Sequence, residues 1–136
     1  MNKYIIYIHI FHIMSIPYSV ASNIHNYCKI HDNYKNAVIN SRDIDTVITG
    51  RSTGHPVQVL KNKLAKEYLK LENDNASIEE LEELGKGALK KAVVDGDIEN
   101  GSLMAGQISG MVKKVQSVKE IIEEMFNEYE EVKRSL

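Results

Sequence analysis

The residues best suited to chemistry lie in the range 95–111, where a turn signal leads into a run of small side chains. Gly96 and Gly101 permit tight turns, and Asn100 is a residue type that caps the first turn of a helix. Small residues then recur at every fourth position, on one face of a helix predicted over residues 102–114: Ser102, Gly106 and Gly110. A helix with such a face lets a ligand approach its backbone closely.

Within this predicted helix, Met104 offers an adaptable apolar contact, and Gln107 offers an amide that both donates and accepts. These properties make Met104, Ala105, Gly106 and Gln107 a candidate binding segment. The alternative interpretation is structural: Gly106 and Gly110 let two helices pack closely, and Gln107 faces water.

Two further groups of polar residues are candidates for binding or catalysis. Arg51 and His55 flank a glycine-containing turn and could contact a phosphate of a nicotinamide cofactor or an acyl carrier, although solvated turn residues are commoner. His31 beside Asp32 suggests acid–base chemistry, but adjacent positions on a helix diverge. Packing or capping is therefore the favoured role of His31.

No metal site is predicted. His9, His12 and His25 match no known ligand spacing, and the glutamates of residues 120–131 alternate with apolar residues, as on the solvated face of an amphipathic helix. The only cysteine, Cys28, excludes an intramolecular disulfide or a multi-thiolate site. It is compatible with the cytoplasm, and a buried structural thiol is expected.

Length and charge restrict the function. The chain has 136 residues, enough for one ordinary domain, whereas a complete eightfold β/α barrel needs about 250. A net charge of -2, with both signs interspersed, argues against a nucleic-acid partner. In residues 1–27 an apolar run superficially resembles a secretory signal, but it is far shorter than the roughly 20 residues that span a membrane.

The pattern of apolar residues predicts a mainly helical chain with one hairpin. A short helix is expected from His31 to Asn40. Residues 46–49 are β-branched and residues 57–60 alternate, so two short strands are expected with turn residues between them. Helical spacing of leucine and tyrosine then runs from Leu60 to Leu71.

Two capping boxes mark the starts of further helices. Ser77 with Glu80 opens a helix that extends to about residue 94, in which Gly85 and Gly87 are compensated by close packing or produce a kink or break. A second box opens the last helix, whose apolar stripe has seven members: Val118, Ile121, Ile122, Met125, Phe126, Tyr129 and Val132.

Several separated blocks resemble one family. Residues 42–51 (RDIDTVITGR), 54–62 (GHPVQVLKN) and 95–111, followed by the helical tail, are similar to the C-terminal part of the flavin-dependent enoyl-acyl-carrier-protein reductase II family, which is related to the nitronate monooxygenases. The resemblance runs from Cys28 to Leu136 without interruption. Residues 1–27 depart from it, and a frameshift or truncation scar is the favoured interpretation, with a signal or anchor as the alternative.

The resemblance implies an α+β fragment, mainly helical with a short hairpin, from the C-terminal part of a (β/α)8 barrel, in which residues 28–136 supply barrel helices and a lid-like segment. In the intact family, FMN and NAD(P)H serve the reduction of a trans-2-enoyl thioester carried by acyl carrier protein. Met104, Ala105, Gly106 and Gln107 would lie beside the flavin. The family's catalytic histidine and phosphate loops would precede Cys28, so no catalytic residue is assigned here.

The resulting hypothesis is a truncated reductase that is inactive alone and binds no cofactor tightly. Its expected partners are the missing barrel half or a second copy, because apolar stripes shaped to cover a barrel would be exposed. Two alternatives stay open: a fragment of a nitronate monooxygenase, and a small non-catalytic helical protein that binds a partner.

Overall fold

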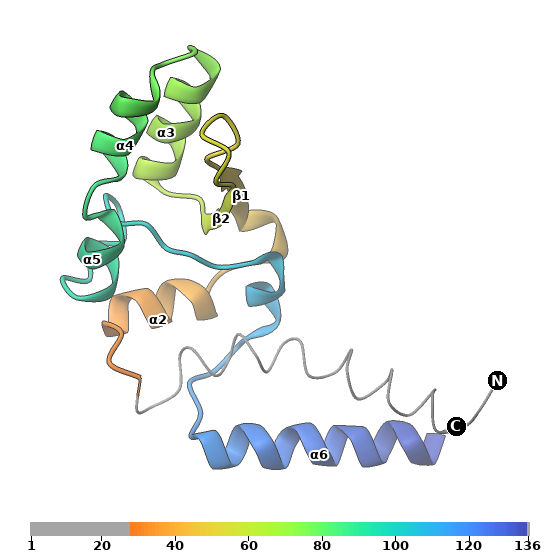
Figure 1. The fold of residues 1–136 in the computed structure, drawn as a ribbon. Coiled ribbons are helices and arrows are strands. Elements are labelled where there is room, and N and C mark those ends of the chain that lie inside the picture. The colour runs from red at the N-terminus through yellow and green to blue at the C-terminus, as the bar shows by residue number, and fades with distance from the viewer. Residues whose placement is uncertain (1–27, 136) are drawn as a thin grey trace. The chain divides into compact units, whose positions relative to one another are not determined.

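The structure, a computed structural model, describes residues 28–135, which belong to two compact units (Figure 1). Lys29–Lys113 forms one unit, and the described part of the other consists of Cys28 and residues 114–135. The interpretation of residues 1–27 as a scar or signal, with His9, His12 and His25, lies outside the described residues.

A two-stranded antiparallel hairpin forms the centre of the larger unit. Its strands are β1 (Thr46–Thr49) and β2 (Val57–Leu60), paired from Thr46 opposite Leu60 to Thr49 opposite Val57. The predicted strands are confirmed residue by residue, because a β-branched run followed by turn residues leaves few other local choices.

The loop between the strands is held both by its own turn residues and by a side chain of helix α3 (Lys63–Asn73). Gly50 adopts the left-handed φ of 78°, and a side chain there would collide with the carbonyl oxygen of His55. The Glu72 carboxylate then accepts hydrogen bonds from Gly50 N (3.2 Å), Ser52 N (3.0 Å) and Ser52 Oγ (2.7 Å). Burial raises the pKa of Glu72, but these bonds outweigh burial and leave it below its usual value.

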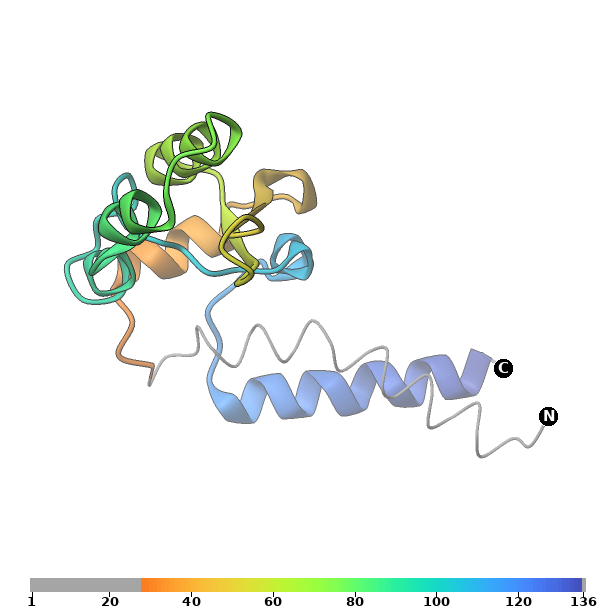
Figure 2. The ribbon, with the colours of Figure 1, turned by 45° about the horizontal axis from the view of Figure 1, so that its top comes forward.

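Four α-helices surround the hairpin: α2 (Asp32–Ile39), α3 (Lys63–Asn73), α4 (Ile78–Gly85) and α5 (Ala88–Val93). Figures 1 and 2 both place α3 beside α4, and α3 also contacts β1. The hairpin and each of the four helices contribute buried side chains, as does the segment after α5: Val38, Val59, Ala65, Leu81, Ala88, Ala92 and Leu103. A small mixed core therefore holds the larger unit together.

Two predicted helix boundaries need correction. The helix expected from Leu60 begins at Lys63, because Leu60 completes β2 and the Asn62 side chain caps α3 by accepting from Ala65 N (2.9 Å). The helix expected to reach residue 94 is broken, since Gly87 adopts a φ of 71° between α4 and α5. The Ser77–Glu80 capping box that opens α4 is confirmed.

The helix predicted over residues 102–114 is wrong. Residues 102–106 are extended, and only a short 3-10 helix, η2 (Gln107–Met111), follows them. The edge of β2 supplies the physical reason, because Leu60 N donates to Leu103 O (2.9 Å) and Ala105 N donates to Gln58 O (3.1 Å). These long-range hydrogen bonds replace the local ones of a helix.

The last helix, α6 (Val118–Ser135), is described by itself as part of the smaller unit. The predicted capping box is confirmed: Ser117 N donates to Glu120 Oε2 (2.7 Å), and Glu120 N donates to Ser117 Oγ (3.2 Å). Ile121 is buried, whereas the side chains of Val118 and Ile122 are exposed. No helix within residues 28–135 has the length and apolar character required to cross a membrane.

Candidate functional site

The candidate segment Met104–Gln107 runs along the free edge of the hairpin. Met104 lies opposite Val59 of β2 in an antiparallel bridge, and the hydrogen bonds of this bridge are made by the neighbouring residues, Leu60 N to Leu103 O and Ala105 N to Gln58 O. In such a pair the two side chains lie on the same face, so Met104 shares the face of Val59, and the neighbours Leu103 and Ala105 point to the opposite face. The helical face expected for Ser102, Gly106 and Gly110 therefore does not exist.

Exposure alternates along this segment. Leu103 and Ala105 are buried, whereas 45% of Met104 is exposed and Gln107 is exposed as well. Buried residues on either side anchor the backbone while Met104 projects outward. The segment therefore presents a thioether and an amide from a fixed backbone, which is the arrangement that a binding surface requires.

Tyr34 on α2 fixes the carbonyl group of Met104. Its hydroxyl donates to Met104 O at 2.8 Å, and the ring is 6% exposed. Burial raises the pKa of Tyr34 to about 12, so the hydroxyl remains a donor at neutral pH. The sequence gives no sign of this role, because a partner 70 positions away leaves no local signal.

The turn before the segment is fixed by Asn62. Its Nδ2 donates to Ile98 O (2.9 Å) and to Gly101 O (2.7 Å), which joins the start of α3 to the turn. Asn100 does not cap a helix as expected. Instead Asp97 Oδ1 accepts hydrogen bonds from Asn100 N (2.9 Å) and Glu99 N (3.1 Å). These bonds hold the pKa of Asp97 below its usual value, and the bonds from Asn100 make the largest contribution.

Gly106 and Gly110, which the sequence predicts on one face of a helix, have different roles. A side chain at Gly110 would lie 2.5 Å from Asp43 N, so this glycine lets η2 pack against η1 (Asp43–Asp45). A side chain at Gly106 would meet no atom within 4 Å. Packing within the chain thus explains Gly110, whereas the open backbone at Gly106 is accessible to a ligand.

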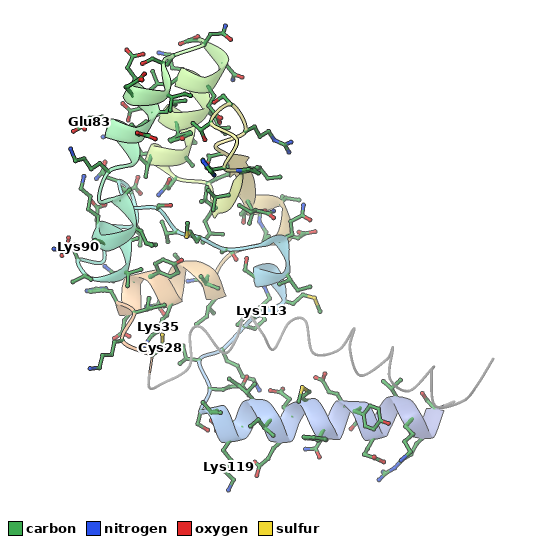
Figure 3. The ribbon with its side chains drawn as sticks, viewed as in Figure 1. Cys28, Lys35, Glu83, Lys90, Lys113 and Lys119 are labelled. Carbon is green, nitrogen blue, oxygen red and sulfur yellow. The ribbon has the colours of Figure 1, made fainter. Side chains whose placement is uncertain are left out.

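Gln107 lines an open hollow of about 420 Å³ together with Arg42, Asp43 and Lys113. The Asp45 carboxylate accepts hydrogen bonds from Nε and Nη2 of Arg42, each at 2.9 Å. These hydrogen bonds lower the pKa of Asp45 to about 2. Lys113, labelled in Figure 3, donates to Ser41 O (3.3 Å). Sequence reasoning missed both cations: Arg42 is brought to Gln107 by the packing of η1 against η2, whereas Lys113 follows η2 in the chain.

The other sequence candidates are not brought to this segment. Arg51 and His55 are exposed in the hairpin loop and do not line the hollow of Gln107. The expected capping role of His31 is confirmed, because its Nδ1 accepts from Asn33 N (3.1 Å) at the start of α2. Cys28 is half-buried, not buried as expected.

The arrangement indicates binding by contact more than acid–base chemistry. Within residues 28–135, no cluster of three or more His, Cys, Asp or Glu side chains could hold a metal ion. The functional groups of the segment are one thioether, one amide and the backbone at Gly106. Such groups suit the edge of a planar ring or an acyl chain.

Comparison with known proteins gives matches to a family model and to solved structures. A family model described as nitronate monooxygenase matches residues 24–128. The solved structure of FabK from Thermotoga maritima is 34% identical, covers 83% of this chain and 36% of its own, and has a TM-score of 0.77. A methionine-to-alanine mutant of that protein is 31% identical, covers 83% of this chain and 33% of its own, and has a TM-score of 0.68.

The chain therefore spans about a third of the length of the FabK structures that it matches. No curated protein matches it.

Proposed function

The chain belongs to the nitronate monooxygenase family, and from this premise we propose that it is part of an FMN-dependent enoyl-acyl-carrier-protein reductase. In this proposal residues 29–113 form a cover over the site where flavin and acyl substrate meet. A (β/α)8 barrel, to which the chain contributes C-terminal elements, holds the flavin, and fatty-acid synthesis is the process served.

The observation that carries this proposal is the structure of residues 103–107. Leu103 and Ala105 are anchored in the core while Met104 projects, and Gly106 leaves the backbone open. Backbone hydrogen bonds from β2 and the Tyr34 hydroxyl fix this arrangement before any ligand arrives. A prepared surface of this kind binds with less loss of conformational entropy than a mobile loop.

The segment fits contact with a flavin ring but not with its phosphate. Met104 supplies a polarisable apolar surface, and the Gln107 amide can donate to or accept from a ring edge or a thioester carbonyl. When bound, FMN would transfer a hydride that originates from reduced nicotinamide. The role of this chain is then to position the ring and the substrate and to exclude water from them.

Similarity to FabK over 83% of the chain supports the reductase in preference to nitronate oxidation, the activity that names the family. We further propose that the barrel, either on a second polypeptide or on a second copy, covers apolar side chains that are now exposed. Ile44, Val94 and Met111 are the clearest of these in the larger unit, at 59%, 60% and 61% exposed.

A chimera tests the function. Residues 28–135 replace the matching third of Thermotoga maritima FabK, and NAD(P)H-dependent reduction of an enoyl thioester is measured beside oxidation of a nitronate. We expect the thioester to be reduced, and we expect Met104→Ala and Gly106→Val to lower kcat/KM about tenfold or more by disturbing the ring contact. Leu89→Ala, which removes a side chain that is also 45% exposed, is the matched control and should leave kcat/KM unchanged.

Flavin binding by the unmodified chain separates the remaining possibilities. Quenching of FMN fluorescence is measured for the chain alone and with the barrel part of FabK added as a second polypeptide. Quenching only in the mixture would support a reductase made of two parts. A folded, FMN-binding chimera that oxidises nitronate but reduces no thioester would favour the monooxygenase, and absence of binding in every sample would favour a non-catalytic helical protein.

A further inference from the structure

A second cavity in the larger unit has no part in the proposed flavin contact. It has a volume of about 150 Å³ and is bounded by the hairpin, α3, the junction of α4 with α5, and residues 102–103. Its wall is mainly aliphatic, from residues such as Val57, Val59 and Leu64. A dry apolar cavity of roughly this volume is known to hold one benzene-sized molecule.

The wall carries no charged side chain but includes three hydroxyl groups, from Thr49, Tyr68 and Ser102. Thr49 pairs directly with Val57, so its side chain shares the face on which Val57 and Val59 line the cavity. Thr49 is only 7% exposed, yet within residues 28–135 its hydroxyl makes no hydrogen bond. No fully enclosed side-chain oxygen in this part of the chain lacks a partner, so the Thr49 hydroxyl opens onto the cavity.

We propose that this cavity is a binding site for one small, uncharged, mainly apolar molecule that carries a single hydrogen-bonding group. The aliphatic wall disfavours ions because it offers no countercharge, and the volume suits a molecule of about the size of a substituted benzene. The Thr49 hydroxyl opens onto the cavity and is available to bond the polar group of the ligand. This site does not depend on the flavin proposal.

The cavity also lies on the face of the hairpin that Met104 shares. Val59 is both a wall residue and the bridge partner of Met104, and Ser102 begins the extended segment. A molecule that fills the cavity therefore stabilises the pairing of β2 with residues 102–105. Occupancy should slow exchange of the Ala105 amide hydrogen, which is bonded to Gln58 O.

The test uses two probes, toluene and benzyl alcohol, with the full chain observed by NMR. We expect saturable binding of both, with intermolecular contacts to the methyl groups of Val59 and Leu64. Thr49→Val keeps the shape of the wall and removes the hydroxyl, so it should weaken benzyl alcohol about five- to tenfold and leave toluene unchanged.

Ala88→Leu should fill the cavity and weaken both probes at least tenfold, because Ala88 is a wall residue that is 2% exposed. Ala37→Leu is the matched control, since Ala37 lines a different hollow, and it should leave both affinities unchanged. If Ala88→Leu does not fold, the probe contacts in the unmodified chain decide. Probe contacts confined to other residues, or equal affinities for benzyl alcohol before and after Thr49→Val, would overturn the proposal.

Discussion

Residues 102–106 and helix α6 both present apolar side chains to the surface, but different interactions fix their backbones. The backbone of α6 is held by its own helical bonds and by the Ser117–Glu120 capping box, all within a few positions in sequence. Residues 102–106 are held by Gln58, Leu60 and Tyr34, which are more than 40 positions away.

The difference explains why one region was predicted and the other was not. A periodic apolar stripe and a capping box indicate a helix from local sequence alone. Small residues at every fourth position predicted a helix in residues 102–110 as well. The backbone of residues 103–105 instead forms hydrogen bonds with the free edge of β2, and these bonds hold it in an extended conformation.

The largest expected effect comes from removing the Asn62 side chain. Asn62→Ala deletes its bonds to Ala65 N, Ile98 O and Gly101 O and leaves buried backbone groups without partners. The free energy of unfolding of the larger unit should fall by about 3 kcal/mol, as measured by urea titration. Asn73→Ala, at the exposed end of α3, is the control, and a loss no greater than in this control would contradict the role of Asn62.

A smaller effect is expected for Tyr34→Phe, which should cost about 1 kcal/mol at pH 7 because Met104 O loses its donor. The pKa of Tyr34 rises from 10.0 to about 12 on folding, so its contribution is present below pH 10 and is lost as the pH rises through 12. The stability difference between the two proteins should therefore begin to fall above pH 10 and be lost as the pH approaches 12. Urea titrations at pH 7, 9 and 11 measure it, and a difference independent of pH would refute the assignment.

The smallest effect is expected at the start of α6. Ser117→Ala removes the exposed cap of Glu120 N and should cost about 0.5 kcal/mol, confined to the last helix. Hydrogen exchange should become faster in the first turn of α6 while the Ala105 amide is unaffected. Faster exchange of the Ala105 amide hydrogen in this variant would contradict the expectation that the two regions are stabilised independently.

Sequence alone determined the parts of this protein whose stabilising interactions are local. The hairpin strands, both capping boxes, α6 and the helix from His31 were predicted because each depends on residue types a few positions apart. The similarity of separated blocks also identified the family, which the match over residues 24–128 confirms. The roles of Met104, Ala105, Gly106 and Gln107 at the flavin stay predictions.

Only the tertiary structure decided how those four residues are presented. Gly110 serves packing against Asp43 whereas Gly106 stays open, although both are glycines with the same apparent helical spacing. Tyr34, Asn62 and Arg42 act on the segment from distant positions, and no periodicity reveals such pairings. The physical reason is that a backbone hydrogen-bonding group accepts whichever partner folding brings to it, and the free edge of β2 provided partners that the local sequence did not contain.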